Sequence, residues 1–86
     1  MNSKHKRTLE AIWADPVSAT IVFADIEKLL VALGVTVKEG KGSGVKFYGP
    51  QGEYLSFHRP HPGKEAKPYQ IRGFREYLIQ LGHKQP

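Results

Sequence analysis

The fold is decided by residues 45–58, which read VKFYGPQGEYLSFH. Apolar and polar side chains alternate over Val45–Tyr48 and again over Tyr54–His58, as they do in a strand with one buried face. The residues between the two runs, Gly49-Pro50-Gln51-Gly52, are typical of a turn. The stretch therefore predicts an antiparallel β-hairpin whose strands each present one apolar face and one polar face.

The register of this hairpin follows from the requirement that its apolar side chains share one face. A loop of five residues pairs Tyr48 with Tyr54 and places His58 opposite Gly44. A loop of three residues would instead place Ser56 opposite Gly44. We favour the five-residue loop, because the run GPQGE is a natural longer turn. The residues expected to face the helices are Val45, Phe47, Leu55 and Phe57, and those expected on the open face are Gly44, Lys46, Tyr48, Tyr54, Ser56 and His58.

Three helices and one further strand are predicted around the hairpin. Apolar residues recur at helical spacing in residues 3–14, 25–33 and 68–81, and they alternate in residues 35–39. The boundary signals are Ser3 as an N-cap, Asp15-Pro16 as a stop, Gly34 and Gly82 as left-handed caps, and Pro68 as the first residue of the last helix.

The resulting fold class is α+β, with the element order ααβββα. The second and third helices each carry one apolar stripe, and packing both on one face of the sheet buries these surfaces together. The opposite face of the three-stranded antiparallel sheet then stays open. We expect a single domain over residues 1–86, with a core over residues 25–82 and an N-terminal helical extension over residues 1–16 that forms an appendage.

The composition is that of one small protein without disulfides. Its 86 residues suit a single modest core, and none of them is cysteine. No apolar run approaches the roughly 20 residues that cross a bilayer. The basic start MNSKHKR is not followed by the apolar core of a signal peptide. We therefore expect a cytoplasmic protein that does not enter a membrane.

Positive charge is concentrated in the second half of the chain. Thirteen lysines and arginines outnumber eight acids, for a formal net charge of +5. Residues 1–43 hold six bases and five acids, whereas residues 44–86 hold seven bases and three acids. This asymmetry favours an anionic partner such as a nucleic acid.

Two imidazoles and a guanidinium fall within the five residues His58-Arg59-Pro60-His61-Pro62. Imidazole takes and gives protons near neutral pH, and guanidinium suits phosphate. Together they indicate work on a phosphodiester, with His58 as general base or acid and His61 as the complementary acid or a phosphate ligand. A metal site is disfavoured, because a His-x-x-His pair without nearby cysteine or carboxylate lacks the three or four ligands that such sites need. No cofactor is expected.

Six basic side chains are candidates for contact with RNA. Arg72 and Arg75 lie three residues apart on one predicted helix and can face the same ligand. Tyr48 and Tyr54 either stack bases or form a cross-strand pair that only stabilises the hairpin. The six are Lys46, Arg59, Lys64, Lys67, Arg72 and Arg75. The first two of these would stabilise the negative charge that develops on a phosphate.

A series of short fragments occurs in a fixed order between residues 25 and 82. They are Leu33-Gly34 at a helix end, then Gly42-Ser43, Pro60-His61, Lys64-Glu65, Lys67-Pro68 and Ile71-Arg72. In this order and spacing the chain resembles the HicA toxins of bacterial type II toxin–antitoxin systems. The resemblance implies a double-stranded-RNA-binding-domain-like fold, cleavage of mRNA, and a HicB antitoxin that covers the active site.

One position departs from the family pattern. In the better-known HicA proteins Gly-Ser is followed directly by the catalytic histidine, whereas here Gly42-Ser43 is followed by Gly44. The family's catalytic residue therefore has no counterpart at position 44. Either the chain is a variant whose histidine has moved, with His58 as the candidate, or it binds RNA without cutting it.

The function expected from the sequence is that of a toxin that degrades mRNA as a metal-independent endoribonuclease and is neutralised by a HicB-like antitoxin. Two alternatives stay open at this point. One is a catalytically silent RNA-binding module of the same fold, and the other is a small regulator whose basic face binds an acidic protein partner. The oligomeric state does not follow from the sequence.

Overall fold

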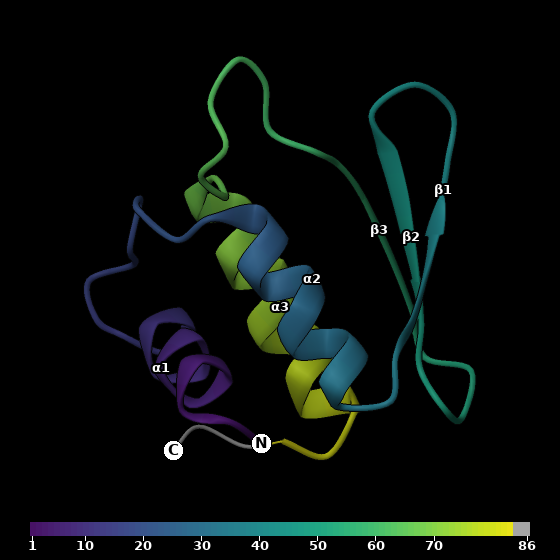
Figure 1. The fold of residues 1–86 in the computed structure, drawn as a ribbon, viewed down its shortest axis with the longest axis horizontal. Helices are drawn as coiled ribbons and strands as arrows, with labels where there is room; N and C mark the ends of the chain where they lie inside the picture. Colours follow the sequence, from purple (N-terminus) through teal and green to yellow (C-terminus); the bar gives the residue numbers. More distant parts are fainter. Residues whose placement is uncertain (84–86) are drawn as a thin grey trace.

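Two helices, three strands and a final helix follow one another in the computed structural model, which describes residues 1–83 (Figure 1). This is the predicted α+β order ααβββα. Over those residues, no helix is long and apolar enough to cross a membrane. The elements are α1 (Ser3–Ile12), α2 (Phe23–Ala32), β1 (Thr36–Glu39), β2 (Gly44–Tyr48), β3 (Tyr54–His58) and α3 (Pro68–Gln80).

The three strands form one antiparallel sheet in the order β1-β2-β3. In the β2–β3 hairpin Tyr48 pairs with Tyr54 and Gly44 pairs with His58, so the predicted five-residue loop and its register are confirmed. A hydrogen bond from the Gly49 amide to the carbonyl of Glu53, at 2.7 Å, closes the loop. His58 therefore stands directly opposite Gly44.

One face of the sheet is covered by α2 and α3 (Figure 1), and the alternation of side chains decides which face it is. Val45 and Phe47 of β2 point to the helices and are buried. Phe74 of α3 lies at the centre of the core, where its ring centroid is 5.6 Å from Phe47, 5.1 Å from Phe57 and 5.5 Å from Phe23 of α2. These aromatic contacts join both helices to the sheet, as the apolar stripes predicted.

The first helix packs on the far side of α2 and α3 from the sheet (Figure 1). Ile12 in its last turn is completely buried in the common core, and Leu9 and Trp13 pack against that core. Arg75 of α3 holds the end of this helix, because its Nε donates to the Ile12 carbonyl and its Nη2 to the Ala14 carbonyl, both at 2.7 Å. The helix expected to be an appendage is thus a third packed layer.

The boundaries of α1 differ from those read in the sequence. The cap is Asn2 rather than Ser3, since Asn2 Oδ1 accepts a hydrogen bond from the backbone amide of His5 at 2.8 Å. The helix ends at Ile12, which is earlier than the expected stop at Asp15-Pro16. Asparagine and serine are both good caps, so local sequence alone did not separate the two.

The boundaries of α2 show the effect of a tertiary contact. This helix begins at Phe23 rather than Asp25, because Phe23 is buried and its amide donates to the Lys64 carbonyl at 2.9 Å. The segment before α2 is thereby tied to the loop before α3. Gly34 and Gly82, with φ of 94° and 89°, have the predicted left-handed conformation after their helices.

Candidate active site

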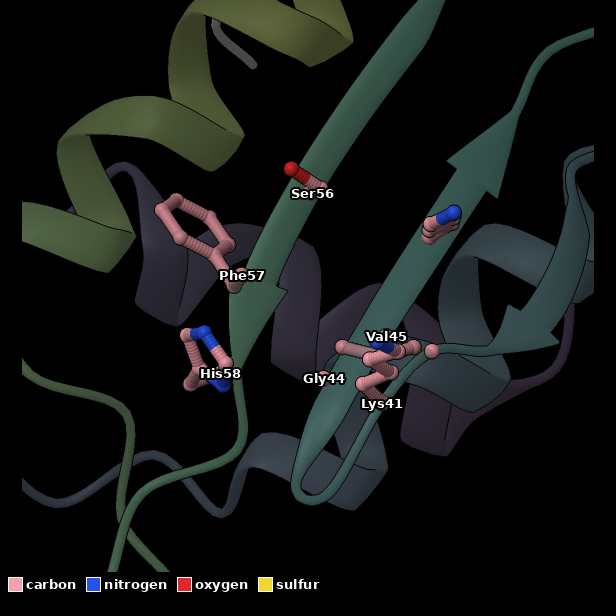
Figure 2. Close-up of a pocket in the computed structure, with 8 residues that line it drawn as sticks. Lys41, Gly44, Val45, Ser56, Phe57 and His58 are labelled. Atoms are coloured by element: carbon pink, nitrogen blue, oxygen red, sulfur yellow. The ribbon is translucent and has the colours of Figure 1, made fainter.

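A pocket of about 350 Å³ lies where the β2–β3 hairpin meets the turn between β1 and β2 (Figure 2). His58 stands on one side of it and Lys41 on the other (Figure 2). Two lysines and an imidazole around a hollow of this size suit a phosphate group. The lining includes Gly40, Lys41, Gly44, Lys46, Ser56 and His58.

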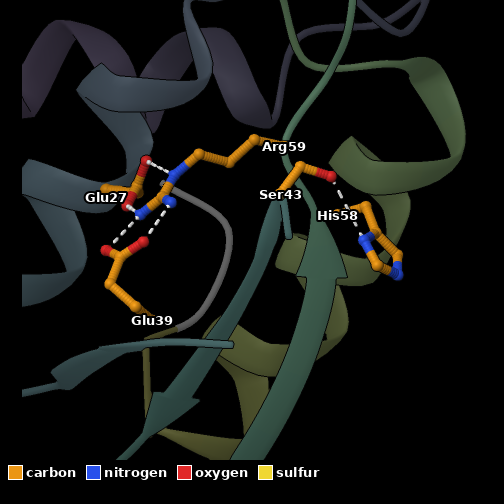
Figure 3. Close-up of polar contacts among 5 residues, drawn as sticks. All are labelled: Glu27, Glu39, Ser43, His58 and Arg59. Atoms are coloured by element: carbon orange, nitrogen blue, oxygen red, sulfur yellow. Dashed lines mark hydrogen bonds and ion pairs between the residues drawn. The ribbon is translucent and has the colours of Figure 1, made fainter. Parts of the chain in front are cut away.

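The imidazole of His58 is exposed at the end of β3 and is oriented by one hydrogen bond (Figure 3). Its Nδ1 lies 3.2 Å from Oγ of Ser43, in the turn before β2. The backbone adds a second link at the same place, since the Arg59 amide donates to the Ser43 carbonyl at 2.9 Å. Because Nδ1 faces Ser43, Nε2 is the nitrogen left to exchange a proton with a ligand.

Gln70 in the first turn of α3 fixes the backbone of His58. Its side chain is buried, and its Nε2 donates to the His58 carbonyl at 2.9 Å. Its Oε1 accepts from the Lys67 amide, also at 2.9 Å, which is half of a capping box. Sequence reasoning missed Gln70, although a glutamine at the third position of a helix that begins at Pro68 is the signal for such a box.

Gly44 leaves no room for a side chain on the present backbone. A Cβ atom at this position would lie 2.9 Å from the carbonyl oxygen of Lys41. That carbonyl accepts a hydrogen bond from the Gly44 amide at 2.8 Å, and the Gly44 carbonyl accepts one from the Gly40 amide at 2.8 Å. The turn is thus closed around position 44, and His58 brings an imidazole to the same pocket from across the strand pair.

The guanidinium of Arg59 is enclosed by two carboxylates (Figure 3). Its Nη2 and Nε donate to Glu27 at 2.9 and 3.2 Å, and its Nη1 and Nη2 donate to Glu39 at 2.6 and 2.9 Å. The hydrogen bonds from Arg59 hold the pKa of the Glu39 carboxyl below its ordinary value, and those to Glu39 and Glu27 raise the pKa of Arg59. The phosphate contact expected of Arg59 would therefore require breaking ion pairs to α2 and β1.

Of the other predicted side chains, Arg75 contacts α1 and the rest are exposed. Arg75 is turned toward α1, and its guanidinium carbon lies 5.7 Å from the centre of the Trp13 ring. Arg72 is exposed, so the two arginines do not form the common surface expected of them. His61 is exposed in the loop before α3, and no hydrogen bond within residues 1–83 joins it to His58. The remaining exposed candidates are Lys46, Lys64 and Lys67, whose contacts with RNA stay predictions.

Strand β1 adds a lysine that sequence reasoning did not include. Lys38 is exposed and pairs directly with Lys46 of β2, so both project from the open face. Its signal was present in the sequence, because Val37 faces the helices and its neighbour on an alternating strand must face the other way.

A family model described as the HicA toxin of bacterial toxin–antitoxin systems matches residues 23–82, well over half of the chain. The matched region begins with α2, covers the sheet, the pocket and α3, and leaves α1 outside. Comparisons with curated proteins and with solved structures gave no match.

Proposed function

The chain belongs to the HicA toxin family of bacterial toxin–antitoxin systems, and from that membership we propose that it is an endoribonuclease that cleaves mRNA without a metal ion. A toxin of such a system has an antitoxin partner, and we propose a HicB-like protein that covers the pocket. The site of action would be the cytoplasm, where mRNA is translated.

The observation that carries this proposal is the position of His58. It lies opposite Gly44, where the resemblance to HicA puts the catalytic histidine, and the Ser43 hydroxyl orients its ring from 3.2 Å. A general base must be held within reach of its proton and must titrate near the working pH. An exposed imidazole with one nitrogen bound to Ser43 and the other free to meet a ligand satisfies the first condition.

The proposed reaction is attack by a ribose 2′-hydroxyl on the adjacent phosphorus. Nε2 of His58 takes the hydroxyl proton, the 2′-oxygen bonds to phosphorus, and the bond from phosphorus to the 5′-oxygen breaks. The leaving oxygen takes a proton from an acid, the role we assign to protonated His61. The products are a 2′,3′-cyclic phosphate and a 5′-hydroxyl, so no external reactant is consumed.

The basic side chains divide between charge stabilisation and binding. Lys41 and Lys46 line the pocket, where a cation stabilises the charge that develops on the phosphate. The exposed Lys64, Lys67 and Arg72 would contact backbone phosphates, which contributes affinity without reading sequence. Arg59 and Arg75 act by positioning, since their guanidinium groups bind within the protein.

A second candidate function has its own support. Residue 44 is a glycine in a turn that leaves no room for a side chain, and a protein without the family's usual histidine there could still bind RNA through the same basic surface. The two candidates differ in one observable, which is whether RNA is cut.

Substituting His58 separates the two candidates. His58→Ala should lower RNA cleavage by roughly 10²–10⁴-fold, the usual loss when a general acid or base is removed. Cleavage is followed on labelled RNA with and without a chelator, and growth inhibition is followed in cells that lack the antitoxin. Folding should persist, because His58 is exposed.

The matched control is His5→Ala, which removes an imidazole from α1 and should leave cleavage unchanged. His61→Ala should match His58→Ala if His61 is the acid, and should lose less if it only binds phosphate. Cleavage that survives in His58→Ala would contradict the proposal that His58 is the general base. An unmodified protein that binds RNA and never cuts it would establish the silent module.

A further inference from the structure

The open face of the sheet is basic and aromatic over its whole length. Alternation along the strands, together with the observed register, places eight residues on this face. None of the eight is acidic, whereas two are lysines, two are tyrosines and one is histidine. The eight are Thr36, Lys38, Gly44, Lys46, Tyr48, Tyr54, Ser56 and His58.

The middle of this face carries two like charges side by side. Lys38 and Lys46 are direct cross-strand partners, an arrangement that destabilises a sheet through repulsion. No ion pair within residues 1–83 neutralises either of them. A bound anion would offset this repulsion, because a phosphate between two ammonium groups attracts both of them.

The end of the face away from the pocket carries two exposed aromatic rings. Tyr48 and Tyr54 are 37% and 50% exposed, with ring centroids 5.2 Å apart and planes inclined by 51°. The Nζ of Lys38 lies 5.6 Å from the centre of the Tyr48 ring. Aromatic rings set next to cations on a solvent-exposed sheet are the elements of a stacking platform for unpaired bases.

The spacing of these groups fits a chain of nucleotides. The tyrosine row, the lysine row and the row of Gly44 and His58 follow one another at intervals of two residues, or about 7 Å each. That interval is comparable to the separation of consecutive phosphates in an extended single strand. The tyrosines therefore lie about two nucleotides from a phosphate held at His58.

We propose that the open face is a binding track for single-stranded RNA. An unpaired base stacks on Tyr48 and Tyr54, the Lys38–Lys46 pair holds the next phosphate, and the chain continues to the pocket at His58. A duplex keeps its bases stacked on one another and cannot place one on the tyrosines. This inference rests on the proposed function for the location of the cleaved bond, and it adds the class of substrate and a subsite that lies away from the chemistry.

The track is tested by binding, with RNA that cannot be cleaved. The probes are a fluorescent oligonucleotide of eight nucleotides with 2′-O-methyl riboses, and the same strand annealed to its complement. Affinity is measured by fluorescence anisotropy over a range of salt concentrations. The single strand should bind at least tenfold more tightly than the duplex.

Two pairs of variants locate the contacts. Tyr54→Leu should weaken binding of the single strand by roughly 5–150-fold, the range for loss of one stacked base, and Tyr54→Phe should stay close to the unmodified protein because it keeps the ring. Lys38→Gln should weaken binding and reduce the salt slope by about 0.7, the value for one phosphate of a single strand. Lys28→Gln on α2 removes the same charge from another surface and should leave the slope unchanged.

The outcomes separate this inference from the proposed function. Preference for the duplex, no binding of either probe, or equal binding by the Tyr54→Leu and Tyr54→Phe proteins would overturn the track. Cleavage is assayed independently on RNA with free 2′-hydroxyls. A protein that binds the probes as expected and does not cleave would overturn only the enzyme, and one that cleaves with both Tyr54 variants alike would overturn only the track.

Discussion

Replacing Gln70 by methionine is expected to destabilise the protein by about 2 kcal/mol and to loosen the backbone of His58. Methionine has nearly the volume of glutamine, so the buried site stays filled and the change removes two hydrogen bonds and little else. One of these bonds joins Gln70 Nε2 to the His58 carbonyl, and the other joins its Oε1 to the Lys67 amide. The variant therefore disconnects α3 from the end of β3 that carries His58.

The magnitude follows from the number of bonds and from their surroundings. Each intramolecular hydrogen bond contributes roughly 0.5–1.5 kcal/mol net, which makes the pair worth about 2 kcal/mol. Both bonds are only part-buried, so the larger penalty for fully buried unpaired groups is not added. In a domain of this size about 2 kcal/mol lowers Tm by roughly 8–16 °C.

Urea unfolding and amide hydrogen exchange measure the two consequences separately. Unfolding reports the lost stability, and exchange at the Lys67 amide reports the lost capping bond. Gln70→Glu is the matched variant, because its carboxylate still accepts from Lys67 but cannot donate to the His58 carbonyl. In that variant exchange at Lys67 should stay slow while RNA cleavage falls. A Gln70→Met protein with unchanged stability and slow exchange at Lys67 would refute the role assigned to this side chain.

Two further changes test the turn and the core. Gly44→His should lower the unfolding free energy by about 1–3 kcal/mol in a urea titration, because its Cβ would approach the Lys41 carbonyl to 2.9 Å and force the turn open; undiminished stability would contradict the closed turn. Tyr77→Phe should cost about 1 kcal/mol at neutral pH through the hydrogen bond from Tyr77 Oη to the Glu53 carbonyl. Burial, with the charge of Glu53, raises the pKa of Tyr77 above its ordinary 10.0. The neutral phenol therefore contributes its full stabilisation below pH 10.0. This stabilisation is lost as the pH rises through the raised pKa. The urea midpoints of the two proteins should therefore converge above that pH, and a constant difference would count against the shift.

The hairpin was predictable because its determinants are local. Alternation over five-residue runs sets which side chains are buried, and the GPQGE loop sets how the runs are paired, so Tyr48 opposite Tyr54 follows without any distant contact. The start of α2, in contrast, is determined by residues that are distant in the sequence. Phe23 enters the helix because its ring meets Phe74 and its amide meets the Lys64 carbonyl, and both partners are some forty or more residues away.

The arginines show the same limit at the site. A basic residue next to His58 indicates a phosphate ligand as long as its partners are unknown. Arg59 forms ion pairs with Glu27 and Glu39, which lie 32 and 20 residues earlier in the sequence. Arg75 donates hydrogen bonds to carbonyls at the end of α1, 61 and 63 residues earlier. Charge can be counted along a sequence, but whether that charge is already paired depends on packing between distant elements. Lys38 is the converse case, because its partner across the sheet is another lysine and its charge stays available.

Under the proposed function, positions 44 and 58 are alternative places for one imidazole, because they are cross-strand neighbours. Directly opposed residues hold their Cβ atoms about 4.5–5.5 Å apart, a distance that a histidine side chain spans. A histidine absent from β2 can therefore be supplied by β3 without moving the pocket, provided that the residue opposite is small. Gly44 meets this condition, and the Ser43 hydroxyl then orients the ring. A comparison along the sequence finds no histidine at position 44, whereas the register of the sheet places the imidazole of His58 directly opposite that position, as the proposed function requires.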